Sequence, residues 1–410
     1  MIMASAPSIP KAGWEVKTLG EVCDFQGGSQ PPKSTFINDS REGYIRLLQI
    51  RDFKSDKYIT FIPESPKNRV CTEEDILIGR YGASVGQIHT GKAGAYNVAL
   101  MKTIPDFDLL NRKFFYLYLN SHLFQSLLMN AADRAAQNGF SKNDISPFPV
   151  PLPPLAEQER IVGILDEAFE GIAAATAQAE KNLHNARELF QSVLQSTFSQ
   201  KGDEWEEVNL LTLLERGWIT SHLDGNHGSN YPRKAEFIEE GIPYISANCI
   251  KDETVDLSLA KYLSPERAAS LRKGIAQDRD VLFAHNATVG PVAILRTEES
   301  KIILSTSLTY YRCNREFILP ECLAHYMRSY GFKSQYLQIM EQSTRNQVPI
   351  TKQREFFHLI PPLPTQQAIV EKLDALSEET KALEAIYERK QSALAELKQS
   401  LLQKAFAGEL

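Results

Sequence analysis

Two stretches of the chain carry apolar residues at alternating steps of four and three, the spacing that places one apolar stripe along an α-helix. Each pattern continues for about five heptads, so we expect two helices of about 40 to 45 residues and about 60 to 68 Å. The expected seam residues are Ile161, Leu165, Ile172, Leu183 and Phe190 in the first helix, and Ile369, Leu373, Leu376, Leu383, Leu394, Leu397 and Leu401 in the second.

The two seams differ in size, because alanine is frequent in the first and leucine in the second. Large and small side chains fill facing layers well, so we expect the two helices to pair within one chain as an antiparallel coiled coil. Two other arrangements are open at this point. One is a surface helix that packs on its own domain, and the other is a parallel coiled coil between two copies of the chain.

The segments that open the two helices repeat each other without a gap. PPLAEQERIVGILD begins at Pro153 and PPLPTQQAIVEKLD begins at Pro361, and the same register later aligns Phe198 with Phe406. The regions before them match more faintly, for example at Trp14 and Trp205. A duplicated unit usually forms a pseudo-twofold object. We therefore predict a domain over 1–152, a long helix over 153–200, a second domain over 201–360 and a second long helix over 361–410.

Short apolar runs bounded by Gly, Pro and Asp indicate β-strands in both predicted domains, and helical patterns follow them. Examples are 44–50 and 76–78 in the first domain and 243–245 and 281–283 in the second. The fold class we predict is α+β. Two similar mixed α/β domains are separated by two long helices that pair as an antiparallel coiled coil.

Composition is that of an ordinary globular protein, with 43% hydrophobic and 23% charged residues among 410. No apolar run approaches the roughly 18 residues that span a bilayer, so we expect a cytoplasmic protein. The five cysteines form no Cys-x-x-Cys pair, which favours reduced thiols over disulfides or a zinc ribbon. The net charge of −6 does not favour DNA binding, although the acidic excess lies mainly on the long helices.

Motifs for catalysis and for cofactor binding are missing from the sequence. It has no Walker A sequence, no Gly-x-Gly-x-x-Gly after a strand, and no Asn/Asp-Pro-Pro-aromatic tetrapeptide for a flipped adenine. His222 and His227 have the wrong spacing for two zinc ligands on one helical face. We predict no catalytic residue, no metal site and no cofactor in this chain.

Polar side chains in two places of each domain are candidates for contacts with DNA, because Arg suits guanine, Asn and Gln suit adenine, and Lys suits phosphate. The first place is a glycine-rich turn after a predicted strand, and the second precedes each long helix. A solvated loop side chain is the alternative for every one of them. The candidates are Arg80, Tyr81, Ser84, Arg134, Gln137, Asn138, Lys142 and Asn143 in the first domain, and His285, Asn286, Thr288, Arg345, Asn346, Gln347 and Lys352 in the second.

The order of domain, helix, domain, helix, with Pro-Pro-Leu-x-x-Gln opening both helices, resembles the specificity subunit of Type I restriction-modification enzymes. The resemblance implies a non-catalytic reader of double-stranded DNA, in which each target recognition domain contacts one half of a split, asymmetric sequence. It also implies that the paired helices span the unread spacer and hold two methyltransferase subunits, which two restriction motor-nuclease subunits join for cleavage. S-adenosylmethionine, ATP and magnesium would then belong to those partner subunits.

Two other functions are open from the sequence. A coiled-coil scaffold or adaptor with two ligand- or protein-binding domains would show no salt-sensitive DNA binding. A methyltransferase or nuclease with a diverged motif would show chemistry in the isolated chain, but the missing tetrapeptide and cofactor loop argue against it.

Overall fold

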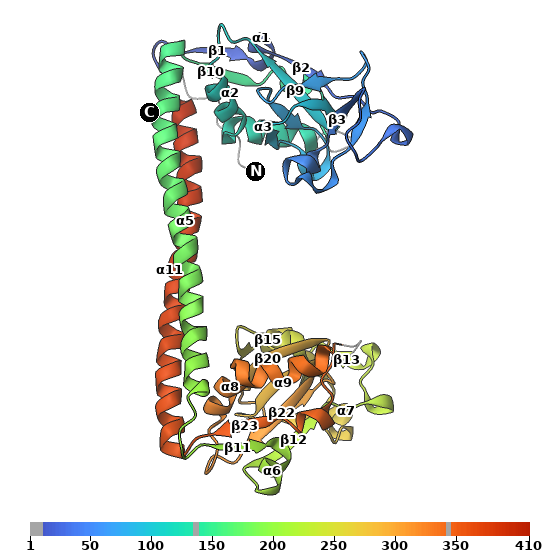
Figure 1. Cartoon of the computed structure of the whole chain (residues 1–410), viewed down its shortest axis with the longest axis vertical. Coiled ribbons are helices and arrows are strands. Elements are labelled where there is room, and N and C mark those ends of the chain that lie inside the picture. Colours follow the sequence, from blue (N-terminus) through green and yellow to red (C-terminus); the bar gives the residue numbers. More distant parts are fainter. Residues whose placement is uncertain (1–10, 134–138, 342–345) are drawn as a thin grey trace. The chain divides into compact units, whose positions relative to one another are not determined.

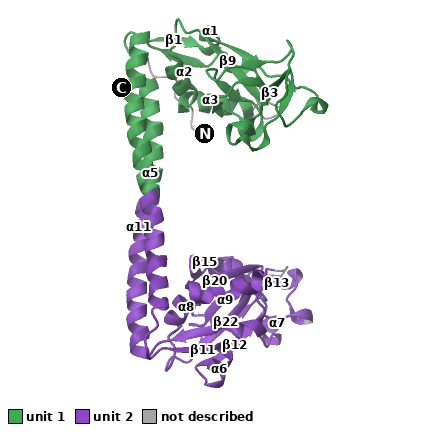
Figure 2. Cartoon of the chain, viewed as in Figure 1, with its two compact units in different colours: residues 1–180, 389–410 green, residues 181–388 purple. Residues whose placement is uncertain are grey.

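The structure, a computed structural model, describes residues 11–133, 139–341 and 346–410. The chain divides into two compact units, shown in Figure 2: residues 1–180 with 389–410, and residues 181–388. Two 45-residue helices, α5 (Leu155–Ser199) and α11 (Leu363–Ala407), contribute one end to each unit. They begin two residues after the prolines that open the repeated segment, as expected where proline directs the chain into a helix.

Unit 1 is built on two four-stranded sheets with the strand orders β2-β9-β6-β7 and β4-β3-β8-β5. All neighbouring strands in them are antiparallel except β3 and β8, which pair in parallel. The strands are β1 (Glu15–Thr18), β2 (Cys23–Gly27), β3 (Tyr44–Leu48), β4 (Phe61–Pro63), β5 (Val70–Cys71), β6 (Leu77–Gly79), β7 (Ile88–His89), β8 (Gly94–Tyr96), β9 (Leu100–Pro105) and β10 (Pro149–Leu152). The short helices are α1 (Leu19–Val22), α2 (Arg112–Leu119), α3 (His122–Asp133) and α4 (Lys142–Ile145).

Unit 2 repeats this plan, with the orders β12-β22-β19-β20 and β13-β17-β14-β21-β18 and a parallel β14–β21 pair. Its strands are β11 (Glu206–Asn209), β12 (Ile219–Asp224), β13 (Phe237–Ile238), β14 (Ile242–Ile245), β15 (Ile250–Lys251), β16 (Thr254–Val255), β17 (Lys261–Leu263), β18 (Ile275–Ala276), β19 (Val281–Asn286), β20 (Thr288–Ile294), β21 (Ile302–Leu304), β22 (Leu308–Cys313) and β23 (Phe357–Ile360). The helices are α6 (Leu210–Glu215), α7 (Pro265–Ser270), α8 (Pro320–Arg328), α9 (Tyr330–Glu341) and α10 (Ile350–Gln353). The α+β class and the internal duplication are confirmed.

The long helices enter the hydrophobic core of each unit. In unit 1, Phe406 of α11 lies 5.1 Å from Phe114 and 5.8 Å from Tyr118 between ring centroids, both on α2. In unit 2, Phe198 of α5 lies 5.5 Å from Tyr326 of α8. The repeat between Phe198 and Phe406 is therefore a repeat of core packing, in which a buried aromatic pair contributes beyond its area.

Within each unit the two helices run antiparallel. In unit 1, Lys398 lies over the ring of Phe169 at 5.1 Å, and the start of α5 shares a core with the end of α11. In unit 2, Arg187 of α5 bonds to Glu384 and Glu388 of α11 at 2.9 and 3.2 Å. The helices therefore pair within one chain, in the first of the three predicted arrangements. Figure 1 labels both helices and shows α5 in green and α11 in orange to red.

The predicted seam of α11 needs a correction at two positions. Leu383 and Leu397 are 39% and 47% exposed, whereas Thr380 is buried and Glu384 and Tyr387 are partly buried. A straight α-helix has 3.6 residues per turn, so a strict seven-residue pattern drifts around it by about 20° per heptad. After Thr380 the packed stripe passes through Glu384, Tyr387, Leu394 and Leu401, and it leaves Leu383 and Leu397 exposed.

The other predicted seam residues do pack. Buried or partly buried side chains are found at Ile161, Leu165, Ile172, Leu183, Phe190, Ile369, Leu373, Leu376, Leu394 and Leu401. None of the helices in the described residues is both long enough and apolar enough to cross a membrane.

Candidate nucleic-acid interface

In unit 1 the two predicted polar places lie side by side. The turn that follows β6 carries Arg80, Tyr81 and Ser84, and Tyr81 forms an isolated antiparallel bridge with Gly139 in the segment before α4. A Cβ atom on Gly139 would lie 2.5 Å from the ring of Tyr81, so this close approach requires glycine. The Ser84 hydroxyl donates to the Tyr81 carbonyl oxygen at 2.7 Å, which closes the turn.

In unit 2 the corresponding turn between β19 and β20 meets the corresponding loop. Asn286 forms an antiparallel bridge with Gln347, and the amide of Ala287 donates to the Asn346 carbonyl oxygen at 2.9 Å. Ala287 has a φ of 64°, the left-handed conformation that such a tight turn demands. Thr288 is exposed and Asn286 is partly buried, so one hydroxyl and one amide lie at the surface of this turn.

A basic side chain fastens the loop to the turn in both units. In unit 1, Nε and Nη2 of Arg80 donate to the Phe140 carbonyl oxygen, both at 3.3 Å. In unit 2, Nδ1 of His285 lies 2.9 Å from the Val348 carbonyl oxygen. Phe140 and Val348 each follow the residue that bridges to the turn, so Arg80 and His285 hold equivalent carbonyl groups.

This geometry corrects one predicted DNA contact. His285 is 1% exposed, so it has no surface to offer to a base, and it acts instead as a support beneath the turn. Arg80 is partly buried and also lies over the ring of Tyr81 at 5.0 Å, whereas Tyr81 itself is 38% exposed. A direct contact with DNA remains a prediction for Arg80, Tyr81 and Ser84.

The lysine candidates are exposed but paired with carboxylates. Lys142 forms an ion pair with Asp24 of β2, and this bond holds the pKa of Asp24 below its usual range. Lys352 bonds to Glu355 at 3.0 Å. Exposed pairs of this kind are worth about 0 to 1 kcal/mol, so either lysine can exchange its partner for a phosphate at little cost. Asn143, Asn346 and Thr288 are exposed, and Gln347 is partly buried. Arg134, Gln137, Asn138 and Arg345 lie outside the described residues.

Sequence reasoning missed a buried amide that supports the loop of unit 2. Gln353, at the end of α10, is fully buried and donates from Nε2 to the Val348 carbonyl oxygen at 3.1 Å. Its Oε1 accepts a bond from the Thr309 hydroxyl at 2.9 Å and lies 3.1 Å from Nε2 of His222. The Val348 carbonyl is therefore held by two side chains, which fixes the loop against the sheet.

Burial depresses the pKa of three histidines in unit 2. It lowers the pKa of His222 to about 3 and that of His358 to about 4, and it also lowers the pKa of His285. Each ring is therefore neutral in the folded protein. Its contribution to stability is fully present above the ordinary pKa near 6.5 and is lost as the pH falls from there toward the lowered folded pKa. Protonation favours the unfolded chain, whose histidines are solvated.

We expect unit 2 to lose about 2 to 5 kcal/mol of unfolding free energy between pH 6.5 and pH 4.5, since each group contributes at most about 1.4 kcal/mol per pH unit. The loss is measured by urea unfolding of a Trp14→Phe variant, followed by tryptophan fluorescence. This variant keeps Trp205 and Trp218 of unit 2 as its fluorophores. His222→Gln should reduce the pH dependence, and His184→Gln, at an exposed position of α5, should not. Equal pH dependence in the two variants would contradict this account.

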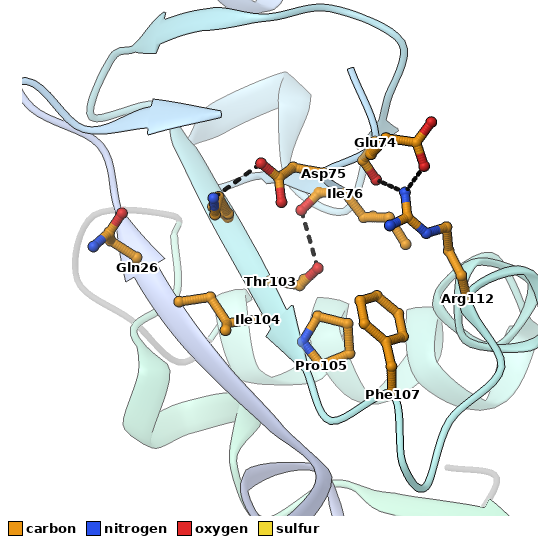
Figure 3. Close-up of a pocket in the computed structure, with 10 residues that line it drawn as sticks. Gln26, Glu74, Asp75, Ile76, Thr103, Ile104, Pro105, Phe107 and Arg112 are labelled. Carbon is orange, nitrogen blue, oxygen red and sulfur yellow. Dashed lines mark hydrogen bonds and ion pairs between the residues drawn. The ribbon is translucent and has the colours of Figure 1, made fainter. Parts of the chain in front are cut away.

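A separate hollow of about 260 Å³ lies in unit 1 between β9 and α2, and Figure 3 shows its lining. Lys102 pairs with Asp75 at 2.9 Å, and Arg112 pairs with Glu74. Both cations of the hollow are thus neutralised by carboxylates, so it offers little net charge to a phosphate. Among the residues that the structure covers, no three His, Cys, Asp or Glu side chains gather as a metal site would require.

Comparison with known proteins gives a consistent result. The family model described as Type I restriction modification DNA specificity domain matches residues 11–183 and 221–391. The chain is 22% identical over 395 residues to the Type I restriction enzyme EcoBI specificity subunit of Escherichia coli, which covers 92% of this chain and 82% of that protein.

Two solved structures share the fold along the chain. One, described under complex assembly and conformational transition of the type I R-M system, has a TM-score of 0.80 at 20% identity and covers 98% of this chain and 100% of that chain. The other, the HsdS subunit from Thermoanaerobacter tengcongensis, has a TM-score of 0.58 at 19% identity and covers 100% of both chains. At this identity the likeness concerns the fold.

Proposed function

The chain belongs to the Type I restriction modification DNA specificity domain family, and from this premise we propose how its two units read DNA. It is the specificity subunit of a type I restriction-modification system, and it has two recognition domains. We propose that each domain reads one half of a split, asymmetric sequence in double-stranded DNA. The chain directs adenine methylation or cleavage by partner subunits and is itself not catalytic.

One observation carries this proposal. Both units build the same turn-and-loop surface on the same sheet order, but they place different side chains there. Unit 1 presents Arg80, Tyr81 and Ser84, and unit 2 presents Asn286 and Thr288 above the buried His285. A common scaffold with different hydrogen-bonding groups is what two different half-sites require, since base edges are distinguished by donors and acceptors.

The modest charge of the chain is consistent with a shared contact to the DNA backbone. Phosphate neutralisation is the large, sequence-independent part of DNA affinity, and it can be divided among the subunits of a complex. The partners that we propose are two methyltransferase subunits and two restriction motor-nuclease subunits. S-adenosylmethionine, ATP and magnesium would be bound by those subunits.

Methylation mapping tests the function directly. In a methylation-free host, the chain expressed with its neighbouring methyltransferase subunit should give a methylated two-part motif in single-molecule sequencing, and that subunit alone should give none. Proteins that co-purify without producing a motif would favour a scaffold with two binding domains. Proteins that do not associate would argue against the proposed complex.

A further inference from the structure

The glutamine that recurs in the repeated segment makes the same three hydrogen bonds in both units. In unit 1, Oε1 of Gln158 accepts from the Asn111 amide, and Nε2 donates to the carbonyl oxygens of Leu109 and Pro153, all at 2.8 Å. In unit 2, Gln366 repeats this with the Leu319 amide and the carbonyl oxygens of Phe317 and Pro361, again at 2.8 Å. The two side chains are 0% and 1% exposed.

These bonds connect three segments that the chain must place relative to one another. Asn111 and Leu319 are the residues immediately before α2 and α8, and Pro153 and Pro361 follow the last strand of each recognition domain. Each glutamine lies in the first turn of a long helix. One side chain therefore ties the start of the long helix to the domain helix and to the strand that leads out of the domain.

A second polar contact lies two turns further along each long helix. Asp166 pairs with Lys113 of α2 at 2.7 Å, and Asp374 pairs with His325 of α8 at 2.8 Å. The aspartates recur in the repeat, whereas their partners differ. A helix held at two points eight residues apart has a fixed direction as well as a fixed position, because the two points are about 12 Å apart along its axis and about 80° apart around it.

We propose that Gln158 and Gln366 are positioning residues that fix the direction in which each long helix leaves its recognition domain, and that they thereby set the selectivity for the spacer between half-sites. This inference rests on the proposed function. A 45-residue helix is about 68 Å long, so a change of about 5° at its start displaces its far end by about 6 Å. One base pair rises about 3.4 Å, so a displacement of about 6 Å changes the distance that the helix can span by more than one base pair.

The experiment uses the complete complex with its methyltransferase subunits and three variants: Gln158→Met, Gln366→Met and Gln367→Met. Methionine keeps the length of the side chain and removes its hydrogen bonds. Gln367 is the matched control, because it is the neighbour of Gln366 on the same helix turn and is exposed. The readout is the methylation rate on duplexes with the wild-type spacer and with spacers one base pair shorter or longer, at unchanged half-sites.

We expect Gln158→Met and Gln366→Met to reduce the preference for the wild-type spacer at least about 10-fold while the preference for the half-site bases stays within about twofold. Gln367→Met should leave both unchanged. Hydrogen exchange gives an independent readout: exchange at the Asn111 amide should rise at least about 10-fold in Gln158→Met, and exchange at the Leu319 amide should not.

Each outcome decides a separate question. A wild-type complex that methylates no two-part sequence would count against the proposed function. A wild-type motif with unchanged spacer preference in both buried variants would overturn the positioning role, even if their stability fell. If Gln158→Met does not fold, Lys113→Ala removes the partly exposed second contact instead, and it should relax the spacer preference about twofold to fivefold; unchanged preference in that variant would overturn the inference as well.

Discussion

Replacing the first recognition domain by that of another specificity subunit is expected to change one half of the methylated sequence and to leave the other half and the spacer as they were. Methylation of the original sequence should fall at least about 100-fold, because each wrong base pair costs about 1 to 3 kcal/mol and several are altered together. The expectation follows from the duplicated fold, in which unit 2 keeps its own turn, loop and core.

The junctions of such an exchange follow from the packing of unit 1. Strands β1 and β10 pair antiparallel from Glu15 opposite Leu152 to Thr18 opposite Pro149, so a segment from about residue 13 to 152 carries both edges of this small sheet. The incoming domain must also accept the long helices. Phe114 and Tyr118 contact Phe406, and losing a buried aromatic side chain costs about 3 to 5 kcal/mol.

The measurement is methylation mapping of the hybrid beside the parent. The appropriate graft keeps Phe114, Tyr118 and the backbone groups at positions 109 and 111 that bond to Gln158. The same graft with Phe114→Ala is the control for failed packing. A hybrid whose two half-sites both change, or neither, would contradict independent reading by the two domains.

The sequence predicted the duplication and the long helices because those features depend on local, repeated patterns. The prolines and the seven-residue spacing place α5 and α11 to within two residues at their starts. The same pattern failed at Leu383 and Leu397. A seven-residue periodicity in the sequence does not show how far the apolar stripe shifts around a helix that has 3.6 residues per turn.

The candidate site was predicted in part. The turn and the loop were found as separate polar clusters, and the structure joins them through the Tyr81–Gly139 and Asn286–Gln347 bridges. Sequence did not reveal that His285 is buried, because it stands between the apolar run 281–284 and the polar turn that begins at Asn286, and the structure continues strand β19 through it. The repeat also marked Gln158 and Gln366 without giving their role, because two of the three partners of each lie 47 and 49 residues away.

Shortening both long helices by one heptad is expected to shorten the unread spacer and to preserve both half-sites. Deleting residues 170–176 of α5 and 391–397 of α11 removes segments that face each other in unit 1, because Phe169 and Lys398 are in contact at their edge. Seven residues are two turns less about 20°, so the remaining seam stays in register. The cores around Ile161 and Phe190 are left intact.

The expected size of the change follows from the rise per residue of an α-helix and the rise per base pair of DNA. Seven residues at 1.5 Å remove about 10.5 Å of helix, which corresponds to at most about 3 base pairs at 3.4 Å each. Methylation at the original spacing should fall at least about 10-fold, and mapping should recover the same half-sites closer together. Replacing the two heptads by others of equal length and pattern is the control and should leave the spacer unchanged. An unchanged spacer in the deletion variant would show that helix length does not set it, and altered half-sites would show that the helices take part in base recognition.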